Sequence, residues 1–189
     1  MTETPNPNIV DADSLTGEMH PIRRVVVGLG SNLGERLASL QGAVNALADT
    51  PDFFVTGVSP VYETEPVDSP EGSKSYLNAV LLADTTLPAA RLMERALAIE
   101  DAFERERGEV SNAPRTLDVD LIVVGDRRSH EDFLRLPHPR AHERAFVLKP
   151  WHDLEPDATL PDHGPIADLL QGSDSAGLTR REDLELEVE

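Results

Sequence analysis

The sequence predicts an α+β fold with a ferredoxin-like core, in which strands and helices follow the order βαββαβ. Apolar, β-branched runs typical of strands alternate along the chain with two segments whose apolar residues recur at helical spacing. Two of the predicted strands follow each other with only a loop between them, which departs from a doubly wound parallel fold. We therefore expect an antiparallel sheet with helices packed on it, followed by a C-terminal extension.

The first half of the predicted core contains one strand, one helix and a strand pair. The strand over 23–29 has a continuous apolar centre, as strands covered on both faces do. A glycine-rich turn and an amphipathic helix up to Ala48 follow. We expect further strands over 53–62 and 76–83, and the loop between them is long enough to suggest a functional role.

The second half of the core contains one helix and one strand. Leu87-Pro88 opens the helix, because proline is tolerated in a first turn, and a strand over 117–124 follows. Beyond it we expect a short segment at 133–136, a helix over 141–148 that ends at Lys149-Pro150, and one or two helical turns over 166–170.

The chain of 189 residues suits one domain with tails. Residues 1–21 are expected to be a flexible acidic N-terminal tail, 22–170 the folded domain and 171–189 an acidic C-terminal tail. The alternation of Leu184, Leu186 and Val188 with glutamate leaves an edge strand as the alternative for the last stretch.

Composition excludes several classes of protein. A net charge of −18 argues against a nucleic-acid binder, because no basic stripe is present to contact phosphates. Without cysteine there is no disulfide, thiolate nucleophile or cysteine metal site. No apolar run approaches a membrane span, and the N-terminus does not resemble a secretory signal, so we expect a cytoplasmic protein.

Two acidic residues lie on the predicted strand 117–124. Residues two apart in a strand point to one face, so Asp118 and Asp120 should lie side by side, while Leu117, Val119 and Leu121 face a core. A divalent cation relieves the repulsion between neighbouring carboxylates, and Mg²⁺ suits such ligands. Arg115, at the mouth of the strand, has a guanidinium suited to phosphate. A solvated pair of surface acids is the alternative, because Asp-x-Asp alone is common.

The glycines after the first strand suggest a different chemistry. Gly28, Gly30 and Gly34 come close to a dinucleotide-binding fingerprint, although the spacing is off by one residue. The alternative is that these glycines only permit a tight turn.

Several separated stretches together resemble the 2-amino-4-hydroxy-6-hydroxymethyldihydropteridine pyrophosphokinase family, over roughly residues 23–161. The Pro-Arg-Thr-Leu-Asp-x-Asp piece at 114–120 is the most specific of them. The others, in chain order, are Gly-Ser-Asn-Leu-Gly at 30–34, Ser-Pro-Val-Tyr-Glu-Thr at 59–64, Tyr-Leu-Asn-Ala-Val at 76–80, Ile-Glu at 99–100, Pro-His-Pro at 137–139 and Arg-Ala-Phe-Val-Leu at 144–148.

The resemblance implies a ferredoxin-like enzyme that transfers pyrophosphate from ATP to 6-hydroxymethyl-7,8-dihydropterin and releases AMP. It implies ATP as co-substrate and two Mg²⁺ ions on Asp118 and Asp120. Both acids, with Arg105 and Arg115, match catalytic positions. Matching pterin-binding positions are Thr64, Val67, Tyr76, Asn78 and Phe146, and matching ATP-binding positions are Glu100, Arg115, Leu121, His138 and Arg144.

The expected partners are these two small molecules, with no nucleic acid and no membrane, and the expected state is a monomer. A non-catalytic ferredoxin-like ligand-binding module is the alternative; it would bind pterin or nucleotide without turnover.

Overall fold

The computed structural model describes residues 20–65, 75–105 and 116–189, with the backbone alone described at Arg105. The elements, in chain order, are β1 (Arg23–Ser31), α1 (Arg36–Ala48), β2 (Phe53–Val58), β3 (Tyr62–Thr64), β4 (Tyr76–Thr85), α2 (Ala89–Arg105), β5 (Asp118–Val124), β6 (Ser129–Glu131), β7 (Leu134–Leu136), the 3-10 helix η2 (Ala141–Glu143), α3 (Ala145–Leu154), β8 (Thr159–Leu160), β9 (Gly164–Pro165), α4 (Ile166–Gln171) and β10 (Leu178–Arg180). Across these described ranges, no helix is long and apolar enough to cross a membrane.

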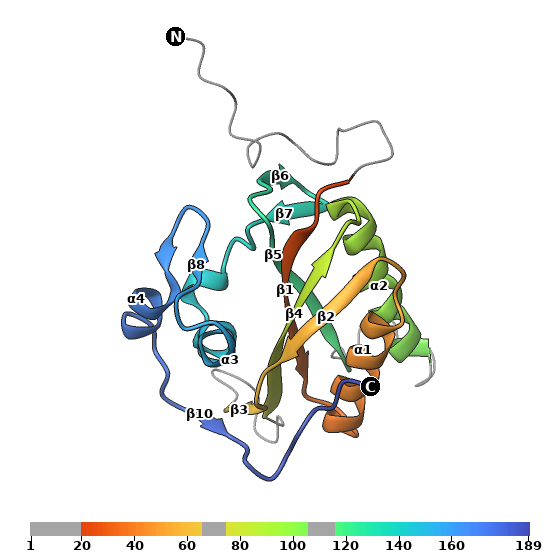
Figure 1. The fold of residues 1–189 in the computed structure, drawn as a ribbon. Helices are drawn as coiled ribbons and strands as arrows, with labels where there is room; N and C mark the ends of the chain where they lie inside the picture. The colour runs from red at the N-terminus through yellow and green to blue at the C-terminus, as the bar shows by residue number, and fades with distance from the viewer. Residues whose placement is uncertain (1–19, 66–74, 106–115) are drawn as a thin grey trace.

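The main sheet confirms the predicted ferredoxin-like, antiparallel architecture (Figure 1). Its order is β10-β3-β4-β1-β5, and β2 pairs with β4 beside β3. Every strand pair in it is antiparallel. The dinucleotide interpretation is wrong for this fold, because Gly28 and Gly30 lie inside β1 between two antiparallel neighbours and not in a turn from a parallel strand.

Two apolar clusters lie on opposite faces of the sheet. Val25, Val27 and Leu29 of β1 pack against α1 and α2 in the larger cluster. Val26, between them in sequence, belongs to a second cluster with Leu148 and Trp151 of α3. The strand period of two therefore divides β1 between two cores. α3 covers the second face, and α4 packs against α3 (Figure 1).

The strand predicted over 53–62 is interrupted. Residues 59–61 separate β2 from β3. Pro60 has no N–H to offer a neighbouring strand, and Ser59 compensates by bonding β4: its N–H donates to Val80 O at 2.9 Å and its hydroxyl accepts from Val80 N at 2.8 Å. The interruption thus keeps the chain attached to β4 while changing its course.

The prediction that a helix ends at Lys149-Pro150 is wrong. After η2, α3 continues through Pro150 to Leu154. Proline removes one helical hydrogen bond, but Leu148 and Trp151 on either side are almost fully buried. Tertiary packing of this apolar face outweighs the lost hydrogen bond.

The acidic stretch at the C-terminus is not the loose tail expected from its composition. Residues 178–180 form β10 on β3, and Leu186 is buried in the larger cluster. Residues 184–189 do not form the alternative edge strand either. The predicted N-terminal tail lies outside the described residues up to position 19.

Burial of α3 gives a stability prediction. Leu148 is fully buried, so Leu148→Ala should lower the free energy of unfolding by about 2–5 kcal/mol. Denaturant unfolding followed by the fluorescence of Trp151, the single tryptophan, measures this. Leu97→Ala on α2 is the matched control, because Leu97 is 45% exposed. Equal losses in both variants would contradict the packing described.

Candidate active site

The pocket lies over the part of the second sheet face that α3 leaves open. Gly28 of β1 stands between Val80 of β4 and Asp120 of β5, and in the next such row Gly30 stands between Asn78 and Asp118. Directly opposed residues in antiparallel strands point to the same face. The two glycines therefore form a bare strip between a polar side on β4 and an acidic side on β5.

The bare strip is the floor of a cavity of about 240 Å³. A Cβ on Gly30 would lie 3.1 Å from Asn78 Oδ1, and one on Gly28 would lie 3.4 Å from Ile122 Cδ1. Side chains here would fill space that the cavity now occupies. The full lining is Gly28, Leu29, Gly30, Thr64, Tyr76, Asn78, Ala79, Asp118, Asp120, Arg144, Phe146 and Val147.

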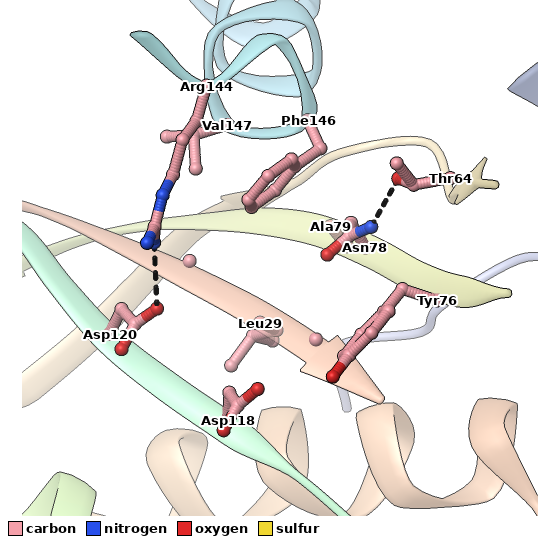
Figure 2. Close-up of a pocket in the computed structure, with 12 residues that line it drawn as sticks. Leu29, Thr64, Tyr76, Asn78, Ala79, Asp118, Asp120, Arg144, Phe146 and Val147 are labelled. Carbon is pink, nitrogen blue, oxygen red and sulfur yellow. Dashed lines mark hydrogen bonds and ion pairs between the residues drawn. The ribbon is translucent and has the colours of Figure 1, made fainter. Parts of the chain in front are cut away.

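Asp118 and Asp120 form the acidic side of the pocket, as predicted from their spacing. Both border the same cavity (Figure 2). Arg144 contacts Asp120, with its Nη1 4.0 Å from Oδ2, and the Asp120 side chain is 41% exposed. This loose contact does not seal the Asp120 carboxylate, so its oxygens stay accessible to a cation.

The donor set of the acid pair fits magnesium. Mg²⁺ usually takes one or two protein carboxylates and completes its shell with water and substrate phosphate oxygens. Among the residues that the structure describes, no group of three or more His, Cys, Asp or Glu is arranged to hold a metal. Asp118 and Asp120, which border one cavity, are a candidate pair of metal ligands.

Two aromatic side chains enter the pocket from different elements. Phe146 reaches in from α3 and Tyr76 from β4 (Figure 2). The guanidinium carbon of Arg144 lies 5.5 Å from the centroid of the Phe146 ring, a cation–π distance. Burial, and then the negative charge of Asp118, raise the pKa of Tyr76 above its usual value.

A hydrogen-bonded pair forms the polar side of the pocket. Asn78 is 5% exposed and its Nδ2 donates to Thr64 Oγ1 at 2.7 Å. This bond fixes the amide plane and links β4 to β3. The Asn78 amide oxygen faces the bare strip at Gly30.

Three residues that matched ATP-binding positions lie outside the cavity lining. Glu100 on α2 is buried beneath the sheet, where its Oε1 accepts from Val119 N at 2.8 Å. Leu121 is buried on the face covered by α1 and α2, as its place in the strand alternation predicts. His138 follows β7, and its backbone N–H donates to the carbonyl oxygen of Ile122 at 2.9 Å.

His138 has a defined ring orientation. Its Nδ1 accepts a hydrogen bond from Arg140 N at 3.1 Å, which leaves the proton of the neutral ring on Nε2. The pKa of the His138 ring lies below its ordinary value, mainly because the ring is buried. The negative charge of Asp120 opposes this shift, and the positive charges of Arg144 and Arg140 add to it. The ring therefore favours the neutral form.

The structure thus brings together seven of the predicted site residues: Thr64, Tyr76, Asn78, Asp118, Asp120, Arg144 and Phe146. Val67, Arg115 and the side chain of Arg105 lie outside the described residues.

Gly28 and Gly30 are the site residues whose role sequence reasoning missed. The glycine pattern predicts a dinucleotide fingerprint or a tight turn, with only Gly28 inside the predicted strand, whereas both glycines lie within β1. The available signal was their spacing of two inside a run of strand-forming residues, since glycine in a strand often marks close approach of a ligand.

The fold and the site define a class: an α+β domain whose open sheet face holds a pair of acids beside a small aromatic pocket. The family described as 7,8-dihydro-6-hydroxymethylpterin-pyrophosphokinase (HPPK) matches residues 26–156, and the chain belongs to this family.

Curated relatives cover most of the chain. One from Pseudomonas aeruginosa, named 2-amino-4-hydroxy-6-hydroxymethyldihydropteridine pyrophosphokinase, is 36% identical over 162 residues, which span 84% of this chain and 97% of the relative. One of the same name from Mycobacterium tuberculosis (strain ATCC 25618 / H37Rv) is 41% identical over 160 residues, which span 78% and 82% of the two chains.

Solved structures agree on the fold. The crystal structure of wild-type Plasmodium falciparum HPPK-DHPS with pterin and p-hydroxybenzoate matches with a TM-score of 0.58 and 13% identity. The match covers 83% of this chain but only 42% of that longer chain. At this identity the likeness supports the architecture alone.

The influence of Asp118 on Tyr76 is testable. Asp118→Asn removes a negative charge that raises the pKa of Tyr76, so the Tyr76 phenol should ionise at a lower pH in the variant. Ring ¹³Cζ shifts measured by NMR resolve the two tyrosines of the chain. Tyr62, whose pKa is raised by burial and Asp153, is the internal control. An unchanged Tyr76 titration would contradict the placement of Asp118.

Proposed function

We propose that this protein transfers pyrophosphate from ATP to the hydroxymethyl group of 6-hydroxymethyl-7,8-dihydropterin, giving AMP and the pterin diphosphate for folate biosynthesis. Membership of the HPPK family supports the reaction. The observation that carries the proposal is that one cavity borders both the acid pair and the two aromatic rings. A phosphate-handling group and a site for a flat heterocycle are then adjacent.

The pterin ring occupies the cavity floor in this proposal. A flat heterocycle fits over Gly28 and Gly30, which have no side chains to obstruct it. Phe146 and Tyr76 supply aromatic surface to the ring. Asn78, held by Thr64, presents amide groups to the polar edge of the pterin.

The triphosphate of ATP lies along the acidic side of the pocket. Asp118 and Asp120 would hold two Mg²⁺ ions, and the metal would supply neutralisation of the phosphate charge. Arg144 is close enough to the same side to contact a phosphate oxygen, because its guanidinium already lies 4.0 Å from Asp120.

The reaction joins the two substrates at the β-phosphorus of ATP. The hydroxymethyl oxygen of the pterin bonds to this phosphorus, and the bond from the phosphorus to the oxygen bridging to the α-phosphate breaks. AMP leaves with that oxygen, and the proton of the hydroxymethyl group passes to solvent. The protein contributes mainly by positioning the substrates and stabilising charge, as is usual in phosphoryl transfer.

The remaining predicted roles rest on the family resemblance alone. These are phosphate contacts by Arg105 and Arg115, a pterin contact by Val67, and ATP-side contacts by Glu100, Leu121 and His138. For Leu121, whose side chain is buried on the other face, such a contact would involve the backbone. A monomeric state and a cytoplasmic location stay predictions.

Removing either carboxylate should abolish turnover. Asp118→Ala or Asp120→Ala should lower AMP formation from ATP and the pterin alcohol by about 10²–10³-fold or more, since charge stabilisation at the transferred phosphate is lost. A coupled AMP assay with and without chelator measures this. Asp162→Ala is the control, because Asp162 pairs with Arg128 at an exposed site. Unchanged turnover in either pocket variant, or pterin binding without magnesium-dependent turnover, would favour the non-catalytic module instead.

Adding a methyl group to the pocket floor should weaken pterin binding. Gly30→Ala places a Cβ 3.1 Å from Asn78 Oδ1, and crowding of about 1–3 kcal/mol corresponds to about a 5- to 150-fold higher Kd. Calorimetric titration with the pterin alcohol measures the affinity. In the control Gly57→Ala the new Cβ meets only Leu154 Cδ2 at 3.6 Å. Unaltered pterin affinity in Gly30→Ala would place the ligand elsewhere.

A further inference from the structure

The C-terminal segment 177–187 lies beyond the residues that match the family, which end at 156. It nevertheless returns to the sheet beside β3 (Figure 1). Leu178 pairs with Thr64 and Arg180 with Tyr62. The ladder is extended at both ends, because Glu65 N donates to Gly177 O at 3.1 Å and Arg181 N donates to Val61 O at 2.8 Å.

The segment therefore borders a strand that carries a site residue. β3 has only three residues, and its pairing with β4 joins Tyr62 to Asn78 and Thr64 to Tyr76. Thr64 in turn accepts the hydrogen bond that fixes the Asn78 amide. Short strands depend on their neighbours for order, so β10 on the outer edge restrains the polar side of the pocket.

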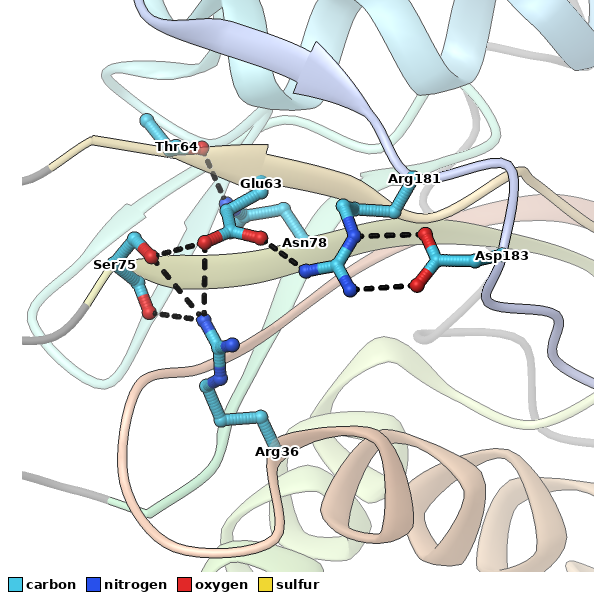
Figure 3. A network of polar contacts seen from close by, with 7 residues as sticks. All are labelled: Arg36, Glu63, Thr64, Ser75, Asn78, Arg181 and Asp183. Carbon is cyan, nitrogen blue, oxygen red and sulfur yellow. Dashed lines mark hydrogen bonds and ion pairs between the residues drawn. The ribbon is translucent and has the colours of Figure 1, made fainter.

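Arg181 bonds β3 through its side chain, and Glu63 of β3 continues the network to Ser75 and to Arg36 of α1 (Figure 3). Its guanidinium makes a forked contact with Asp183, at 2.9 Å from Nε and 2.7 Å from Nη2, while Nη1 bonds Glu63 of β3. Glu63 also accepts from the Ser75 hydroxyl. Arg36 of α1 donates to the Ser75 carbonyl oxygen at 2.8 Å and lies 3.6 Å from Glu63.

The network is partly enclosed, with Arg181 30% and Glu63 21% exposed at their side chains. Hydrogen bonds from Ser75 and Arg181 lower the pKa of Glu63, so the carboxylate is ionised at neutral pH. Ser75 immediately precedes Tyr76, a lining residue of the pocket. The network thus fixes the chain on both the β3 and β4 sides of the pocket wall.

The far end of the segment is attached as well. Gln41 of α1 exchanges two hydrogen bonds with the backbone of Glu187, at 2.7 and 2.9 Å. Leu186 is 8% exposed and packs in the larger cluster. The segment is therefore held at both ends, and Arg181 lies on the stretch between them.

We propose that Arg181 is a positioning residue for the pterin substrate. It contacts neither substrate. Through Glu63 and Ser75 it holds β3 and the start of β4 in the register that presents Thr64, Tyr76 and Asn78 to the pterin. The inference rests on the proposed function, and it assigns to the C-terminal segment a selective effect on one of the two substrates.

The test separates the two substrates kinetically. Arg181→Ala should raise KM for the pterin alcohol by about tenfold, with KM for ATP and kcat changed by less than about twofold, because the acid pair on β5 is not part of the network. Arg181→Lys keeps a charge near Glu63 and should recover part of the effect. Glu63→Gln combined with Arg181→Ala should be little worse than either alone, as expected for residues in one network.

The control is Arg128→Ala, which removes an arginine that also makes a forked contact with a carboxylate, Asp162, away from the pocket. Its kinetic constants should be those of the wild type. An unchanged pterin KM in Arg181→Ala, or equal rises in both KM values accompanied by a lower Tm, would overturn the inference.

A readout that needs no turnover distinguishes this inference from the function on which it rests. If the wild-type protein formed no AMP from ATP and the pterin alcohol, the proposed function would be refuted. Amide hydrogen exchange at residues 62–64 still decides the positioning role: faster exchange in Arg181→Ala than in Arg128→Ala supports it, and equal exchange overturns it.

Discussion

The alternation of side chains along β1 is the constraint on which the rest of the structure depends. Val25, Val27 and Leu29 face the helices α1 and α2, so the residues between them must face the other side. On that side Val26 packs under α3, whereas Gly28 and Gly30 have no side chains and line the pocket. A slip of one residue in β1 would turn its valines onto the pocket face and its glycines into the larger cluster.

Charge imposes a second constraint on the site. The chain carries a net charge of −18, so its overall field opposes the approach of a triphosphate. Asp118 and Asp120 strengthen that opposition locally unless a divalent cation accompanies the nucleotide. Arg144, which faces both Asp120 and the Phe146 ring, is a positive group already in place at the pocket. The site is therefore suited to a metal–nucleotide complex more than to free nucleotide.

Much of this arrangement could be predicted from the sequence, because it follows from local periodicity. The alternation in 117–124 predicts that Asp118 and Asp120 share a face and that Leu121 lies on the other, and the structure shows both placements. The course of α3 through Pro150 and the return of the C-terminal segment could not be predicted in the same way. Both depend on contacts between residues far apart in sequence, such as Trp151 in its cluster and Arg181 on Glu63. The roles of Gly28 and Gly30 depend likewise on which strands lie beside them.

The pairing of β10 with β3 also bears on the solubility of the protein. A chain that lacked residues 178–180 would present the backbone N–H and C=O groups of β3 to solvent, and an unpaired strand edge is a template for association between molecules. β10 replaces that edge with another three-residue strand, which differs in being followed by the charged Arg181, Glu182 and Asp183. Short, charged edges resist further strand addition, so this acidic C-terminus protects the sheet against aggregation.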